Sequence, residues 1–534
     1  MKKILKYLVL PTLVFSAAAC TDLTENLEGD ITETINVDGI PDPNNNTGGG
    51  PLDGAYSKLR DGSAGHGATY SIQEITTDEM CIAAKGGDWF DGGILIQLHQ
   101  HTFTPVHGFI ENAWNHAYGG ISESNNLLKS DSEVTLDANQ TAQIRGLRAF
   151  FYMRLLDMFG NVKIVTENSS DAPQSSRAEV FDFVEGELLD ILGLTELTAG
   201  ADLSGSFLGT DVDAYRVNQY AALGLLSKLY LNAEVYRGTA MYDKAAIAAG
   251  LVIDSGVYSL CDDGCTATNL GKRAGVDTDP DDLEGYAAVF APNNNGNPEH
   301  IFSIDFDEVT GGGMNFSQMN LHYSSQFTWN FDAQPWNGYA TLEEFYNSYE
   351  DGDARKTANF VVGQQFDFGG SAILDYASDD DDIQLSYTPS INELQPNSLR
   401  EAGARPGKFS FQQFGRPDMN NDYTLVRLGD LYLVRGEAMA RMSGNWNMAL
   451  DDVNTVRARA KVSALSSLDA DSFYDERGRE MFQESSRRTD MIRFGKFGGT
   501  WWEKAPSDST RELFPIPQGQ IDSSDGSLTQ NPGY

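Results

Sequence analysis

Residues 215–254 read YRVNQYAALGLLSKLYLNAEVYRGTAMYDKAAIAAGLVID, and this stretch decides the fold class of the chain. Apolar residues recur at helical spacing over 215–236 and again over 242–254. Only the short break Arg237-Gly238-Thr239 separates the two runs. Small and aromatic residues, Ala233, Tyr236 and Ala245, stand where two packed helices would approach closely. The stretch therefore predicts a helical hairpin.

A second pair of runs, 422–442 and 446–460, has the same layout and breaks at Ser443-Gly444-Asn445. Both pairs resemble degenerate tetratricopeptide hairpins. Further runs with helical periodicity extend over 109–128, 142–159 and 178–197. The expected fold is mainly α: a tetratricopeptide-like helical-hairpin scaffold over about 109–259 and 422–495.

The two helical parts are separated by a long insertion, about 260–421, which is rich in Gly, Asn, Asp and aromatic residues. It is too long for a single connector and too aromatic to be disordered. Alternating runs such as 301–306 predict a few short strands within it. Because loops on a rigid scaffold often carry binding residues, we expect the ligand site in this loop-rich insertion, with the loop-like segment 70–107 meeting it in space.

The charge of the chain restricts its partners. Lys and Arg total 38 and Asp and Glu total 77, which gives a formal net charge of −39. This excess of negative charge disfavours nucleic acids, anionic membrane surfaces and strongly anionic polysaccharides. Binding of a neutral ligand is unaffected.

The first 19 residues are typical of a signal peptide, with three early lysines followed by a short apolar run. The small residues before Cys20 resemble a bacterial lipobox, although Ala17 replaces the usual Leu. We expect acylation of Cys20, a flexible tether over 20–50, and a membrane attachment only through the lipid. Cleavage nearby as an ordinary signal peptide remains the alternative.

Common catalytic sequence signatures are absent. The chain has no HExxH, GxSxG or GxxxxGK[ST] motif. Four histidines lie close together in sequence: His99, His101, His107 and His116. If His99 and His101 lay in a strand, both rings would point to one face and could bind zinc. No third ligand is fixed by the spacing, so we expect neither a metal nor another cofactor.

Two acidic turns and a cysteine pair are interpreted as local structural features. Asp277–Asp282 has the early oxygen spacing of a calcium loop, but Ala288 stands where the bidentate Glu belongs. This turn and Asp379–Asp382 are interpreted as solvated acidic turns. Cys261 and Cys265 either close a small disulfide loop or remain thiols, and the sequence leaves both possibilities open.

Aromatic residues in glycine-flanked loops point to a carbohydrate site. A sugar ring stacks its C–H face on Trp or Tyr while Asn, Asp or Gln bind its hydroxyl groups. The segments Gly86–Gly93 and Phe327–Tyr339 combine these residue types. The candidate ligand-binding residues are the stacking set Trp89, Trp329, Trp336, Tyr339 and Phe90 and the hydroxyl-binding set Asp78, Asp88, Asn330 and Asn337.

The layout from Cys20 to Tyr534 resembles the SusD-like (RagB/SusD) family of Bacteroidetes outer-membrane lipoproteins. The resemblance rests on motifs spread along the chain: Trp114-x3-Tyr118-x2-Ile121-x3-Asn125, Arg145-x2-Arg148-Ala-Phe-Phe-Tyr152, Asn297-Pro-Glu299, Asp353-Ala-Arg355, Arg427-Leu-Gly-Asp430, and Glu476-Arg477-x2-Glu480-x3-Glu484-x2-Arg487-x2-Asp490-x2-Arg493. We interpret the last run structurally, with Glu484 pairing to Arg487 or Arg488 and Asp490 to Arg493 along one helix.

The resemblance implies a single SusD-like domain over 51–534 and a binding protein rather than an enzyme. Such a protein lies on the outer surface of the outer membrane, anchored by lipid, where it captures an oligo- or polysaccharide and delivers it to a SusC-like TonB-dependent transporter. The acidic charge favours a neutral glycan, such as a laminarin-like β-glucan or an α-glucan. The alternative is a surface glycoside hydrolase or a metal-dependent hydrolase, which would use carboxylates or the His99 and His101 pair.

Overall fold

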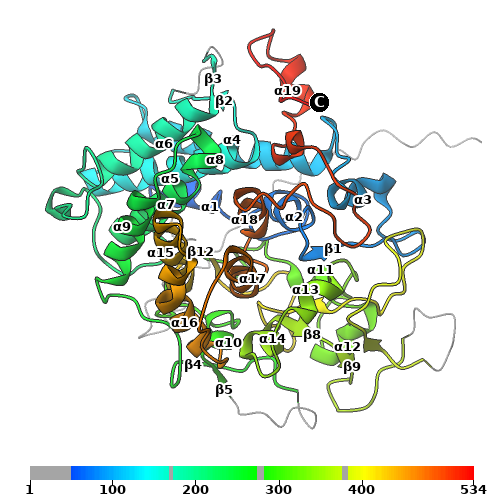
Figure 1. Ribbon diagram of the computed structural model, residues 1–534. Helices are drawn as coiled ribbons and strands as arrows, with labels where there is room; N and C mark the ends of the chain where they lie inside the picture. Colours follow the sequence, from blue (N-terminus) through cyan, green and yellow to red (C-terminus); the bar gives the residue numbers. More distant parts are fainter. Residues whose placement is uncertain (1–49, 168–171, 274–281, 376–382) are drawn as a thin grey trace, which may run out of the picture. The chain divides into compact units, whose positions relative to one another are not determined.

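The computed structural model describes residues 50–167, 172–273, 282–375 and 383–534 (Figure 1). The expected signal peptide, Cys20, nearly all of the tether, and the acidic residues 277–281 and 379–382 lie outside the described residues. Within the described ranges, none of the helices has both the length and the apolar character needed to cross a bilayer.

The first group of long helices comprises α4 (Gly108–Leu128), α5 (Ala138–Met158) and α6 (Arg177–Ile191), which pack in sequence order. Capping boxes at Asp137 and Ser176 satisfy free backbone N–H groups where α5 and α6 begin. Gly120 allows close packing of α4 on α5, since a Cβ atom there would lie 2.1 Å from the Phe151 ring.

The predicted hairpins are present. The first consists of α7 (Gln219–Leu231), the short α8 (Ala233–Arg237) and α9 (Tyr242–Ile253); the second consists of α15 (Leu428–Ser443), the 3-10 turn η5 (Trp446–Ala449) and α16 (Leu450–Arg459). Figure 1 shows α7, α9 and α15 side by side, and these helices contact one another. This confirms the mainly α, hairpin-based fold class.

One expected helix begins differently. Residues 423–427 form the strand β12 (Tyr423–Arg427), which pairs antiparallel with β6 (His300–Ile304). Aromatic and β-branched residues favour this conformation, and all five residues of β12 are buried. The helix therefore starts at Leu428, and the strand pair ties the insertion to the second hairpin.

The remaining described strands are short antiparallel pairs: β1 (Met80–Cys81) with β7 (Ala340–Thr341), β2 (Val162–Lys163) with β3 (Gln174–Ser175), β4 (Thr266–Thr268) with β5 (Asp282–Glu284), β8 (Phe360–Val361) with β11 (Arg405–Pro406), and β9 (Gly363–Gln364) with β10 (Ser386–Tyr387). Most of them lie in the insertion, as predicted.

Short helices complete the chain. They are α1 (Asp53–Ser57), α2 (Thr69–Glu74), η2 (Asp91–Gly93), α3 (Ile94–His99), η3 (Leu203–Gly205), α10 (Tyr286–Val289), α11 (Phe316–Asn320), η4 (Tyr323–Ser325), α12 (Gln326–Trp329), α13 (Glu343–Asn347), α14 (Ala354–Asn359), η6 (Ser509–Glu512) and α19 (Gln518–Asp522). Segment 70–107 thus contains α2 and α3 as well as loops.

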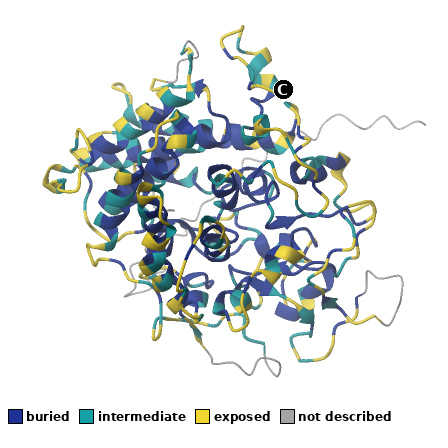
Figure 2. Ribbon diagram, in the orientation of Figure 1, coloured by how far each residue is buried: buried dark blue, intermediate teal, exposed yellow. Residues whose placement is uncertain are grey.

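The C-terminal motif forms two helices, α17 (Ala470–Met481) and α18 (Arg487–Arg493), both largely buried (Figure 2). The expected pairing of Glu484 with Arg487 or Arg488 is wrong, because the chain turns between the helices and sends these side chains to different partners. Arg487 pairs with Asp78 and Arg488 with Asp157. The expected contact between Asp490 and Arg493 is confirmed at 2.7 Å.

Glu484 instead belongs to a buried ionic network that joins the insertion to the C-terminal helices. Arg427 lies at its centre, with Nη1 2.8 Å from carboxylate oxygens of both Glu299 and Glu480 and Nε 2.7 Å from Glu484. Arg459 also pairs with Glu299 and Glu480. The carboxylates compensate the buried guanidinium charges, so this charge pattern has a structural role.

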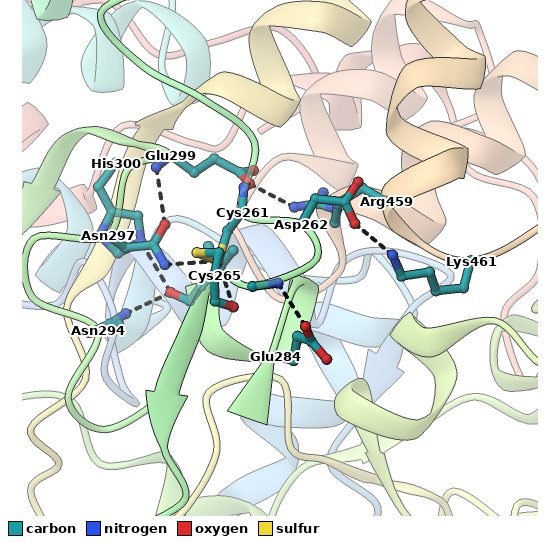
Figure 3. The surroundings of a disulfide bond; sticks show 12 residues. Cys261, Asp262, Cys265, Glu284, Asn294, Asn297, Glu299, His300, Arg459 and Lys461 are labelled. Carbon is teal, nitrogen blue, oxygen red and sulfur yellow. Dashed lines mark hydrogen bonds and ion pairs between the residues drawn. A yellow bond between two sulfur atoms is a disulfide. The ribbon is translucent and has the colours of Figure 1, made fainter. Parts of the chain in front are cut away.

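Cys261 and Cys265 form a disulfide bond, which settles the question that the sequence left open (Figure 3). The backbone N–H of Cys261 donates to Glu299, 3.2 Å away, and Asn297 contacts the Cys261 sulfur. The small loop therefore lies against the ionic network. Cys81 is a buried free thiol.

Candidate functional site

The candidate site forms where two loops distant in sequence are brought together by the β1–β7 strand pair. Met80 lies opposite Thr341 and Cys81 opposite Ala340. The loop after β1 and the loop before β7 therefore emerge at the same end of this antiparallel ladder. The expectation that segment 70–107 meets the insertion is met at this point.

Trp89 is held in the first loop by a tight turn. The backbone N–H of Lys85 donates to the carbonyl of Asp88 at 2.8 Å, and Gly86 supplies the positive φ of 68° that the turn needs. The indole Nε1 of Trp89 donates to the backbone carbonyl of Trp336, 2.6 Å away. Gly338 allows this approach, because a Cβ atom there would lie 3.0 Å from the indole.

The second loop is held by its backbone. Trp336 N–H donates to the carbonyl of Gln318 at 2.6 Å, and Gly338 and Tyr339 both donate to Met319. The side chain of Trp336 is nevertheless 50% exposed. A large aromatic ring with a fixed backbone and free surface is a suitable platform for a flat apolar ligand face.

Together the loops and the adjoining turn η4 enclose an open cavity of about 530 Å³, within the size range of small-ligand sites. Its polar groups include Asp88, Asp91 and Gln334. The hydroxyl of Tyr323 donates to Asp88 at 2.6 Å. Burial and the nearby carboxylate raise the pKa of Tyr323, so its hydroxyl remains a donor at neutral pH.

His66 closes one side of the cavity. Its ring lies edge-on to Trp89, with centroids 5.4 Å apart, and Nδ1 is 3.1 Å from the Tyr339 hydroxyl. Burial lowers the pKa of His66 to about 4. The cavity wall is therefore neutral at this position near pH 7.

The structure brings three predicted residues, Trp89, Trp336 and Asp88, to this one cavity. Phe90 is 47% exposed but does not line it, and Asn330 is exposed where α12 ends.

Three other candidates lie in the interior. Trp329 is 7% exposed and stacks on Phe331, Asn337 donates to the carbonyl of Arg400, and Tyr339 is fully buried beneath His66. Their burial does not fit direct contact with a ligand. Aromatic density in the sequence could not separate core rings from exposed ones.

Sequence reasoning missed four polar lining residues: His66, Asp91, Tyr323 and Gln334. Gln334 lies in the aromatic segment Phe327–Tyr339, two residues before Trp336. Tyr323 and His66 reach the cavity through the tertiary fold, and neither carries a local signal of its own.

The histidine pair adopts another role. His99 ends α3, not a strand, and its Nε2 lies 2.8 Å from the carbonyl of Trp502. His101 lies 2.8 Å from the carbonyl of Thr76 and 2.9 Å from Ser507. Both rings are buried structural groups. Among the described residues, no group of three or more His, Cys, Asp or Glu side chains is arranged to hold a metal.

The chain combines a helical-hairpin scaffold with an aromatic cavity built from loops, which is the arrangement expected of a binding protein. Two family models match the sequence: one described as "SusD family" over residues 293–534, and one described as "Starch-binding associating with outer membrane" over 57–231. The chain belongs to the SusD-like family, as its sequence motifs indicated.

Relatives and solved structures agree with this assignment. The chain is 26% identical to "Starch-binding protein SusD" of Bacteroides thetaiotaomicron, over 94% of this chain and 90% of that protein. It is 22% identical to "SusD-like protein P2" of Formosa agariphila, over 84% and 85%. The structure of a "Laminarin binding SusD-like protein" superposes with a TM-score of 0.65 at 22% identity, over 91% of this chain and 98% of that chain. "Surface glycan-binding protein A from Bacteroides thetaiotaomicron in complex with laminarihexaose" gives 0.64 at 20%, over 90% and 98%. At these identities the structural likeness establishes the fold.

Proposed function

We propose that this protein captures a glycan at the cavity between Trp89 and Trp336 and releases it unchanged. The observation that carries the proposal is the hydrogen-bonded tryptophan pair beside the Asp88–Tyr323 pair. Sugar recognition needs an aromatic surface for the C–H face of the ring and polar groups for its hydroxyls. The cavity offers both within one rigid frame.

The ligand is a neutral polysaccharide, and a β-glucan is the first candidate. Asp88 and Asp91 line the cavity, the chain has a net charge of −39, and the neutral His66 adds no positive charge. This combination repels uronate-rich or sulfated chains. Two proteins of similar fold carry laminarin or laminarihexaose in their names, which supports testing laminarin first.

The family and the N-terminal sequence support a proposal for the cellular setting. We propose that Cys20 is acylated and holds the domain on the outer face of the outer membrane, where it passes the glycan to a SusC-like TonB-dependent transporter. The description of the matching family model includes association with the outer membrane. The Cys261–Cys265 disulfide is consistent with an exported protein.

The test is affinity gel electrophoresis of residues 21–534 in gels that contain laminarin, starch, other neutral glucans, alginate or a sulfated glycan, with assays for released sugar in the same samples. Retardation by a neutral glucan without product supports the proposal. Sugar release would instead indicate a surface hydrolase, for which Asp88 and Asp91 would be the first carboxylates to replace.

A further inference from the structure

A second cavity lies at the opposite end of the β1–β7 ladder. Its volume is about 500 Å³, and it is lined by residues just before β1 and just after β7, including Asp78 and Leu342, and by the loop that carries Trp501 and Trp502. Trp336 and Leu342 are six residues apart, so their Cα atoms are at most about 22 Å apart. One polymer chain can therefore reach both cavities.

Trp502 gives this cavity an aromatic wall. The Nε2 atom of His99 lies 2.8 Å from the carbonyl oxygen of Trp502, and this contact fixes the backbone at Trp502. Both tryptophan side chains are partly exposed, but the Lys504 ammonium lies 4.2 Å from the ring centroid of Trp501. Trp502 is therefore the ring better placed to accept a ligand.

Carboxylates supply the polar groups of the cavity. Asp78 forms a bidentate pair with Arg487, at 2.7 Å and 2.9 Å, so these two charges offset each other. Glu344 and Asp475 also line the cavity, and both are exposed. Within the described residues neither forms a hydrogen bond or a close ion pair, although Arg487 and other nearby cations act electrostatically on Asp475. These free acceptors suit ligand hydroxyl groups and repel anions.

We propose that this cavity is a second glycan subsite, in which a neutral sugar ring stacks on Trp502 and donates hydroxyl hydrogen bonds to Glu344 and Asp475. The inference rests on the proposed function and extends it: the same polysaccharide chain is held at two points. Binding at two linked points strengthens the capture of long chains far more than that of short ones.

The experiment measures affinity for a long laminarin and for a short laminari-oligosaccharide, using residues 21–534 and isothermal titration. The variants are Trp502→Ala, Trp336→Ala and the pair Glu344→Gln with Asp475→Asn. Trp336, Glu344 and Asp475 are exposed, and Trp502 is half-buried. Phe207→Ala, an exposed aromatic outside both cavities, is the matched control. Thermal unfolding of each variant verifies that it is folded.

The proposal predicts that Trp502→Ala and the double amide variant weaken binding of the long chain about tenfold or more while the Trp336 site still binds the short ligand. Trp336→Ala should leave weak residual binding. Unchanged affinity for the long chain in both the Trp502 variant and the amide variant would overturn the second subsite while leaving the proposed function intact. Absence of glucan binding by the wild type would contradict the proposed function itself.

Ionic strength separates a neutral sugar from a cationic ligand, which acidic groups and an aromatic ring also suit. Binding attributable to the Trp502 cavity should be the same at low and high salt. If this cavity binds only amine-bearing oligosaccharides, and added salt abolishes that binding, the subsite is not one for a neutral glycan.

Discussion

The indole N–H of Trp89 donates a hydrogen bond to the backbone carbonyl of Trp336, 2.6 Å away, across 247 residues of sequence. This contact adds a side-chain link between two loops that the β1–β7 strand pair already brings together. It orients Trp89 while leaving the Trp336 ring 50% exposed. The cavity is therefore formed before a ligand arrives, which lowers the entropic cost of binding.

Replacing Trp336 by Ala should reduce glycan affinity by about 1–3 kcal/mol, because the variant loses the aromatic surface that the sugar would cover on binding. Stability should change little, since half of the side chain is already exposed. Trp89→Ala should weaken binding at least as much, through the lost ring and the lost loop contact. Titration with the glucan and thermal unfolding measure the two quantities, with Phe207→Ala as control. Equal affinity in wild type and Trp336→Ala would exclude this cavity as the main site.

Gly120→Ala should destabilise the fold, whereas Gly119→Ala should not. A Cβ at 120 would lie 2.1 Å from the Phe151 ring, and one at 119 meets no atom within 4 Å. Overpacking costs about 1–3 kcal/mol, while an alanine in open helix stabilises by about 0.5–1 kcal/mol. Urea unfolding of the two variants checks the α4–α5 packing, and equal stabilities would show that the two helices are less closely packed.

Arg427→Met should cost about 3–5 kcal/mol, because Glu299, Glu480 and Glu484 each lose one of their buried cationic partners. Lys461→Met is the control: Lys461 pairs with Asp262 and Asp263 at the surface, where a pair contributes about 0–1 kcal/mol. The free energy of unfolding in urea distinguishes them. A small effect at Arg427 would mean that water reaches the network.

The effect of Asp422→Asn on the free energy of unfolding should become more favourable as pH rises. Burial raises the pKa of Asp422 from 3.8 to about 8, so the folded protein holds a proton there that the unfolded chain has lost. The stabilising contribution of this carboxyl is complete below its unfolded pKa and is lost as pH rises through about 8. The variant carries no such proton, and the Tyr215 hydroxyl, 2.6 Å from the carboxylate, still has an acceptor. Its stability relative to wild type should therefore increase between pH 4 and 8, by at most about 1.4 kcal/mol per pH unit. Urea midpoints at several pH values measure this, and a pH-independent difference would contradict it.

Much of the scaffold was predictable, because hydrophobic periodicity and glycine breaks are local signals. The hairpins around Gly238 and Gly444 formed as expected, and both glycines adopt the left-handed conformation. The predicted start of the second hairpin was wrong because Tyr423–Arg427 is a short buried run with aromatic and β-branched residues, and such a run fits a strand as well as a helix.

The site was only partly predictable, because exposure of an aromatic ring is decided by contacts distant in sequence. Trp329 and Trp336 lie in one aromatic segment, yet Trp329 stacks on Phe331 in the core and Trp336 faces the cavity. Likewise, Glu484 has two local arginines at helical spacing but pairs with Arg427. The chain turn after Met481 decides this pairing, and no spacing rule contains it.

The most direct test of the central claim is a crystal structure of residues 21–534 with a neutral gluco-oligosaccharide. The account predicts a sugar ring within about 4 Å of the Trp336 indole face, with hydroxyl hydrogen bonds to Asp88. A ligand seated elsewhere, with the cavity between Trp89 and Trp336 empty at saturating oligosaccharide, would contradict it.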